Sequence, residues 1–97
     1  MSHATKIKLS SRDIADGMMS LPEWTCDGER ITRTFVFSTF PEAINFILRF
    51  APHADAMDHH PEIFNVYTRV RVELTTHDVN GLTAADFSLA RIINSLF

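Results

Sequence analysis

The feature that most restricts the fold of this 97-residue chain is the alternation of apolar and polar residues between positions 64 and 77. A period of two places successive side chains on opposite faces of an extended chain, so this stretch is predicted to form β-structure with one face in the core. Periodicity alone leaves open one long strand or a hairpin that turns at Thr68-Arg69. The expected core side comprises Val66, Val70, Val72 and Leu74, and the other side comprises Tyr67, Arg69, Arg71, Glu73 and His77.

A helix is predicted immediately before this stretch, from Thr39 to about Met57. Thr39 can accept a hydrogen bond from the first turn, and Pro41 stands where a missing backbone N–H costs little. Apolar side chains along this helix cover more than one core-facing stripe, so part of the helix is available to face another subunit. Pro52 is expected to bend or interrupt the helix near Phe50.

The remaining segments predict two further helices and a first hairpin. Residues 10–13 have the spacing of a capping box before a short first helix, and residues 83–86 open a last helix. Two β segments flank Asp27-Gly28, a dipeptide that accommodates a positive φ in a hairpin turn. The order α-ββ-α-ββ-α predicts a two-layer α+β domain, in which a four-stranded antiparallel sheet has its helices packed on one face.

Length and composition set the domain organisation and exclude several classes of function. A chain with 45% hydrophobic residues can bury one modest core, so we expect a flexible arm over residues 1–8 and a single domain over residues 9–97. The net charge of −3 offers no basic surface for nucleic acid. No apolar run is long enough to span a membrane, and the first residues lack a secretory signal. Together with the single Cys26, these features favour a cytoplasmic location.

The segment from residue 55 to residue 62 places two histidines and three carboxylates within eight residues. Asp55 and Asp58 at a helix C-terminus oppose the helix dipole by roughly 0.3–1 kcal/mol each, and such local conflicts tend to mark functional sites. Four of the five histidines lie between residues 53 and 77, and imidazole transfers protons near pH 7. A single histidine is usually a solvated loop residue, but an adjacent pair beside two carboxylates favours acid–base chemistry.

Histidine could serve here as a metal ligand or as a proton donor and acceptor. His59, His60 and His77 with an aspartate could offer three nitrogens and one oxygen, but adjacent histidines rarely converge on one ion. Pro61 restricts His60 to an extended conformation, which holds the two neighbouring imidazoles on opposite sides of the chain. Neither a His-Glu-x-x-His helix nor a pair of cysteines is present, and Cys26 has no recognisable activating partner. We therefore expect no metal and favour general acid–base catalysis by histidine.

The spacing of these residues resembles the signature of the pterin-4a-carbinolamine dehydratases. Two runs are similar to that family at almost every position: Glu62-Ile-Phe-Asn-Val-Tyr67 and Leu74-Thr-Thr-His-Asp-Val-Asn-Gly-Leu-Thr83. The resemblance covers about residues 9–97. Asp55 stands where the family usually has Glu. The residues that match the signature are Asp55, His59, His60, Pro61, Tyr67, His77 and Asp86.

The resemblance implies an enzyme of tetrahydrobiopterin recycling that dehydrates 4a-hydroxytetrahydropterin to quinonoid dihydropterin without a metal or organic cofactor. It implies that His59 and His77 act as acids on the 4a-hydroxyl, and that His60 binds the pterin ring or serves as base. Asp86 also has a structural explanation, because an acid at the third helical position completes a capping box. The residues expected to bind substrate, orient imidazoles or support the site are Asp55, Asp58, Pro61 and Asp86.

The resemblance also implies a second hairpin that turns at Thr68-Arg69, and assembly into a homodimer or homotetramer. The expected ligand is a small pterin, with neither nucleic acid nor a membrane as a direct partner. Two alternatives remain: a pterin-binding protein of another pathway, such as molybdopterin metabolism, or a non-catalytic cofactor that stabilises a transcription-factor dimer, as vertebrate members do. The intact set of histidines favours catalysis, because a scaffold has no need of it.

Overall fold

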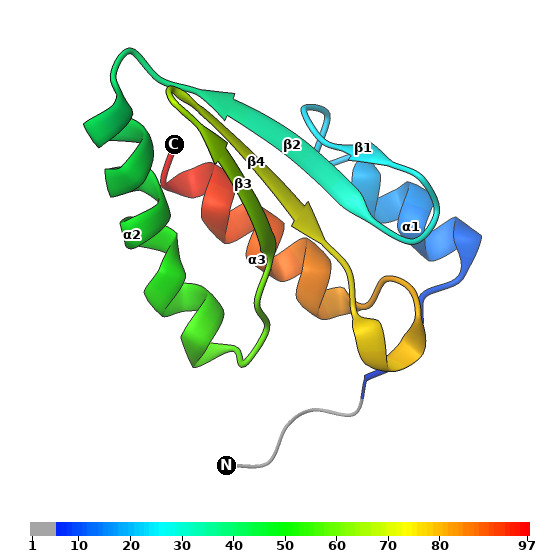
Figure 1. Cartoon of the computed structure of the whole chain (residues 1–97). Helices are drawn as coiled ribbons and strands as arrows, with labels where there is room; N and C mark the ends of the chain where they lie inside the picture. The colour runs from blue at the N-terminus through cyan, green and yellow to red at the C-terminus, as the bar shows by residue number, and fades with distance from the viewer. Residues whose placement is uncertain (1–5) are drawn as a thin grey trace.

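The computed structural model describes residues 6–97, which follow the predicted order α-ββ-α-ββ-α (Figure 1). A short 3-10 helix, η1, precedes the last α-helix. The elements are α1 (Ser11–Met18), β1 (Thr25–Cys26), β2 (Ile31–Val36), α2 (Phe40–Ala56), β3 (Glu62–Val66), β4 (Arg69–Leu74), η1 (His77–Val79) and α3 (Ala84–Ser95). The part of the predicted arm over residues 1–5 lies outside the described residues.

The four strands form one antiparallel sheet in the order β1-β2-β4-β3. The two central strands, β2 and β4, pair from Ile31 opposite Leu74 to Val36 opposite Arg69. The helices lie against one face of this sheet, as predicted (Figure 1). The α+β class and the two-layer architecture expected from the sequence are therefore confirmed.

The core lies between the sheet and helices α2 and α3. Every second residue of the central strands faces the helices, whose own buried residues recur at three- and four-residue spacing. Phe46 of α2 connects the layers, because its ring centroid lies 4.7 Å from that of Phe35 and 5.3 Å from that of Phe50. Burial of each such side chain contributes about 1.5–3 kcal/mol. The other buried apolar residues include Ile31, Ala43, Ala54, Val70, Val72, Leu74, Leu89, Ala90 and Ile93.

Arg33 has the sequence parity of the buried face of β2, between Ile31 and Phe35, yet it carries a charge. Its guanidinium lies 4.3 Å from the centroid of the Phe35 ring, and its Nη1 donates to Asn94 Oδ1 at 2.8 Å. The same oxygen accepts from Trp24 Nε1 at 2.8 Å. Because aromatic faces and a carbonyl oxygen both suit a guanidinium, Arg33 closes the edge of the core without an unpaired polar group.

The second hairpin turns at Tyr67-Thr68, one residue before the predicted Thr68-Arg69. Tyr67 has a φ of 52°, a left-handed conformation that few non-glycine residues adopt. Asn65 holds this turn, since its Nδ2 donates to the carbonyls of Tyr67 at 3.3 Å and Arg69 at 3.0 Å. A two-residue turn reverses the parity of the faces, so Val66 lies opposite Arg69 and is exposed. The prediction that Val66 faces the core is wrong.

Pro52 is expected to bend or interrupt the helix near Phe50, but α2 continues through Pro52 to Ala56, so the expected interruption does not occur. Proline removes only the hydrogen bond to the carbonyl four residues earlier, which belongs to Leu48. Leu48 is 63% exposed, so water can replace the lost donor. No helix within residues 6–97 is both long enough and apolar enough to cross a lipid bilayer.

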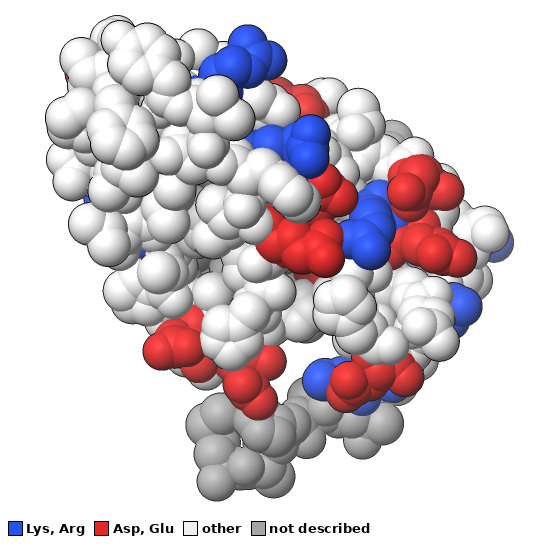
Figure 2. Space-filling model, viewed as in Figure 1, with Lys and Arg blue, Asp and Glu red and all other residues white. Residues whose placement is uncertain are grey.

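The sheet face opposite the helices carries alternating basic and acidic side chains (Figure 2). Arg71 Nε lies 3.1 Å from Glu73 Oε2, and Arg30 pairs with Glu62. Over α2 and β3 the surface in the same view is largely without charge (Figure 2). The large apolar residues exposed on these two elements are Phe40, Leu48, Ile63, Phe64 and Val66.

Candidate functional site

The C-terminus of α2 determines where the two adjacent histidines begin. Met57 caps the helix, and Asp58 follows with a φ of 49°. The N–H of Asp58 donates to the carbonyl of Asp55, and the N–H of His59 donates to the carbonyl of Ala54, both at 3.0 Å. This pair of bonds is the Schellman arrangement, in which one left-handed residue reverses the chain after a helix. Asp58 occupies the position usual for glycine, and the turn directs the chain back toward α3.

His59 lies below the surface after this turn, with only 7% of its area exposed. Its Nε2 is 2.5 Å from Oδ1 of Asp86, which is fully buried in the first turn of α3. A carboxylate on one ring nitrogen fixes the orientation of an imidazole and leaves the other nitrogen available for proton transfer. The structure therefore brings together two of the predicted site residues that are 27 positions apart in the sequence.

The second oxygen of Asp86 ties this pair to the loop that follows β4. Oδ2 of Asp86 accepts from the backbone N–H of Thr83 at 2.9 Å and from Oγ1 of Thr76 at 2.8 Å. The hydroxyls of Thr76 and Thr83 are 2.9 Å apart, and both residues are buried. Asp86 thus completes the predicted capping box of α3 and also binds His59. Nothing local in the sequence marks the contact of Thr76 with Asp86.

His77 follows Thr76 directly and begins η1. The loop is closed by a backbone pair, in which the N–H of Thr76 donates to the carbonyl of Gly81 at 2.8 Å and the N–H of Gly81 returns a bond at 3.4 Å. The His77 side chain is exposed, and its imidazole makes no hydrogen bond to any residue from 6 to 97. Its position therefore depends on the loop backbone, which Thr76 anchors to Asp86.

His60 belongs to a second pair on the surface. Its Nε2 lies 2.8 Å from Oδ1 of Asp55, and both side chains are mostly exposed. The short side chain of Asp55 therefore reaches the imidazole. The half-buried Pro61 follows, and His59 and His60 differ sharply in exposure, as expected if their side chains point away from each other.

The three imidazoles are held in different ways. His59 contacts a buried carboxylate and His60 an exposed one, whereas His77 is positioned by the backbone of its loop. Among the described residues, no group of three or more His, Cys, Asp or Glu side chains is placed to hold a metal ion. Imidazoles paired with carboxylates can donate and accept protons near neutral pH. The chemistry that this donor set favours is proton transfer.

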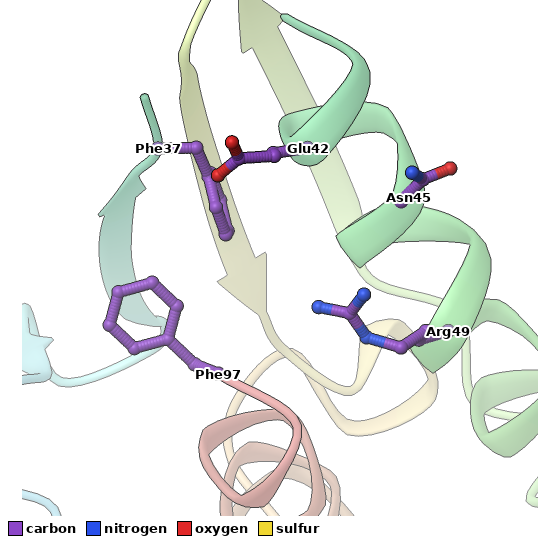
Figure 3. A pocket seen from close by; sticks show the side chains of 5 residues that line it. All are labelled: Phe37, Glu42, Asn45, Arg49 and Phe97. Carbon is purple, nitrogen blue, oxygen red and sulfur yellow. The ribbon is translucent and has the colours of Figure 1, made fainter. Parts of the chain in front are cut away.

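A pocket of about 350 Å³ lies elsewhere, beside the first half of α2. Figure 3 shows Arg49 and Glu42 extending toward the space between the rings of Phe37 and Phe97, with Asn45 turned away. None of the predicted site residues lines it. It is therefore separate from the histidines that follow the other end of the helix.

Comparison with known proteins gives one consistent result. The sequence profile described as pterin 4 alpha carbinolamine dehydratase matches residues 7–96. A protein of Novosphingobium aromaticivorans, provisionally named a pterin-4-alpha-carbinolamine dehydratase, is 52% identical over 80 residues, which are 80% of this chain and 83% of that protein. A protein of Prochlorococcus marinus with the same provisional name is 46% identical over 92 residues, 95% of this chain and 96% of that protein.

The fold also resembles those of solved structures. The crystal structure of a Brucella melitensis protein described as a transcriptional coactivator/pterin dehydratase superposes with a TM-score of 0.88 at 39% identity, over 93% of this chain and 98% of that one. A pterin dehydratase-like protein identified as a RuBisCO assembly factor in the alpha-carboxysome gives a TM-score of 0.62 at 18% identity, over 75% of this chain and 84% of that one. The second likeness concerns the fold alone.

Proposed function

The chain belongs to the pterin 4 alpha carbinolamine dehydratase family, and on that premise we propose that it dehydrates 4a-hydroxytetrahydropterin to quinonoid dihydropterin in tetrahydrobiopterin recycling. In this reaction the bond between C4a and the hydroxyl oxygen breaks, and that oxygen leaves as water after it receives a proton. The adjacent ring nitrogen loses its proton, and a C=N double bond forms. The reaction needs one proton donor and one proton acceptor.

The observation that carries this proposal is the double role of Asp86. One of its oxygens binds His59, and the other binds Thr76, the residue before His77. One buried carboxylate therefore connects the chain segments of His59 and His77, the two residues proposed to act as acids on the 4a-hydroxyl. A protein that used this fold only as a binding scaffold would need neither imidazole, so the arrangement favours catalysis.

The remaining proposed roles follow from exposure. His60 is open to solvent beside Asp55, which suits contact with the pterin ring or removal of the proton from its nitrogen. Pro61 limits the conformations of His60, and Asp58 shapes the turn that precedes His59. No step in this scheme requires a metal or an organic cofactor.

We also propose that the protein assembles with copies of itself. β3 is an edge strand, and α2 exposes apolar residues that the core of one subunit does not use. Exposed apolar area of this kind next to an open strand edge is typical of a protein interface. The expected assembly is a homodimer or homotetramer, and the mass of the particle from light scattering after size-exclusion chromatography would count the subunits.

The proposed activity is tested by stopped-flow absorbance of freshly generated 4a-hydroxytetrahydropterin, with and without the protein. The wild type should accelerate its decay, and the double variant His59→Ala/His77→Ala should lose about 10²–10⁴-fold of that acceleration. The circular dichroism spectrum of the folded variant and its particle mass should match the wild type, although the loss of His59 should lower its free energy of unfolding. A wild type that leaves the decay rate unchanged would remove the enzyme interpretation.

A further inference from the structure

The segment before α1 is held against the loop that carries His77 by three contacts. The N–H of Leu9 donates to the carbonyl of Leu82 at 2.8 Å. The stem of Lys8 lies over Gly81 so closely that a Cβ at Gly81 would be 2.7 Å from Lys8 Cε. Lys6 Nζ donates to Oδ2 of Asp78 at 2.7 Å. Residues 6, 8 and 9 thus contact residues 78, 81 and 82 of the loop in the same order.

Lys6 stands among carboxylates that adjoin both proposed acids in the sequence. Asp78 follows His77, and Asp58 precedes His59. The hydrogen bond to Asp78, together with the negative charges of Asp78 and Asp58, raises the pKa of the Lys6 ammonium above its usual value. The same hydrogen bond lowers the pKa of the Asp78 carboxyl. Lys6 therefore remains a cation, which attracts the carboxylates next to His77 and His59 at the surface. Asp86 connects the same two segments in the interior.

We infer that Lys6 is a positioning residue of the proposed dehydratase site, which fixes the loop from 77 to 80 and thereby the imidazole of His77. This inference rests on the proposed function. Its physical basis is the contrast among the histidines: His59 and His60 each bind a carboxylate, whereas His77 has no such bond within residues 6–97. An imidazole without a bond of its own takes its direction from its backbone, and Lys6 binds the residue next to it.

The expected effect is moderate, because the Lys6–Asp78 pair is largely exposed and water screens it. Loss of the pair should leave substrate contacts in place and weaken only the alignment of one proton donor. The value of kcat should therefore fall while KM stays the same. High salt should reduce the contribution of the pair, since exposed ion pairs are weakened as the ionic strength rises.

The test compares Lys6→Ala, Lys6→Arg and the exchanged pair Lys6→Asp/Asp78→Lys in the stopped-flow assay. Lys6→Ala should lower kcat roughly two- to fivefold at low salt and by a smaller factor at about 1 M salt. Lys6→Arg and the exchanged pair should recover most of the loss, which a merely structural role of the lysine stem would not produce. Arg12→Ala, which removes an exposed positive charge from α1, is the matched control and should leave kcat unchanged.

A second measurement does not depend on turnover. The ring resonances of His77 in ¹H–¹³C NMR spectra should shift or broaden in Lys6→Ala and not in Arg12→Ala. An active wild type with the same kcat and the same His77 resonances in Lys6→Ala would overturn this inference and leave the proposed function intact. A wild type without dehydratase activity would overturn the proposed function and the catalytic role of Lys6 with it, even if the His77 resonances moved.

Discussion

Two histidines that are neighbours in the sequence each bind an aspartate, but in opposite environments. The side chains of His59 and Asp86 are 8% and 0% exposed, whereas those of His60 and Asp55 are 59% and 82% exposed. The distances between the paired atoms are similar, 2.5 Å and 2.8 Å. The two pairs therefore differ in their exposure to solvent.

That difference assigns different physical roles to the pairs. In a buried pair each partner satisfies a polar group that water cannot reach, so removal of one partner leaves the other unsatisfied. In an exposed pair water replaces either partner at little cost. His59 should therefore serve both stability and chemistry, while His60 should be free to serve chemistry alone.

The largest expected effect is that of Asp86→Ala. This change removes the acceptor of the His59 imidazole, of the Thr76 hydroxyl and of the Thr83 N–H at once. Each buried donor left without an acceptor costs about 1–3 kcal/mol, so the three losses together should destabilise the fold by at least about 3 kcal/mol. Urea denaturation followed by circular dichroism should show a fall in the free energy of unfolding of that size, and dehydration should be lost.

The matched control is Asp55→Ala, which removes the acceptor of the exposed pair. Its free energy of unfolding should stay within about 0.5 kcal/mol of the wild type. Equal losses from Asp86→Ala and Asp55→Ala would show that burial does not separate the two pairs.

The second prediction separates chemistry from stability at His60. Because its side chain is exposed, His60→Ala should leave the urea midpoint unchanged, yet dehydration should slow by a factor on the order of 10². Stopped-flow rates and urea midpoints would be measured on the same preparations. His53→Ala is the control, since His53 is an exposed histidine of α2 outside the proposed site, and both quantities should match the wild type. Full activity in His60→Ala would leave His60 without a chemical role.

Local signals in the sequence predicted the elements well. Thr39 caps α2 as expected, with its hydroxyl 3.3 Å from the N–H of Glu42, and Thr83 caps α3. These signals act within four residues, so the sequence carries them directly. The strand alternation predicted the burial of Val70, Val72 and Leu74 for the same reason.

The contacts that build the site could not be predicted in this way. The bond between Thr76 and Asp86 joins residues ten positions apart, and it depends on how the loop from 77 to 81 closes. The turn at Tyr67-Thr68 was predicted one residue too late, because its left-handed backbone is held by the Asn65 side chain rather than by a glycine. Both cases need the positions of other segments, which the alternation and cap patterns do not contain. The sequence itself indicated the histidines, and the family resemblance added Asp86 to the site, but neither indicated Thr76.

A third carboxylate gives the smallest expected effect and refines the comparison, because Asp27 is exposed like Asp55 but accepts from backbone N–H groups. Its Oδ1 lies 2.9 Å from the N–H of Glu29 and 2.8 Å from that of Arg30, and these bonds lower the pKa of the Asp27 carboxyl below its usual 3.8. A lowered folded-state pKa means that the ionised group stabilises the fold above pH 3.8 and that this contribution disappears as the pH falls through the folded-state value. Asp27→Asn should therefore lower the Tm slightly at pH 6, and thermal melts should converge with the wild type toward pH 2. A difference that persists undiminished at low pH would show that charge on Asp27 is not its cause.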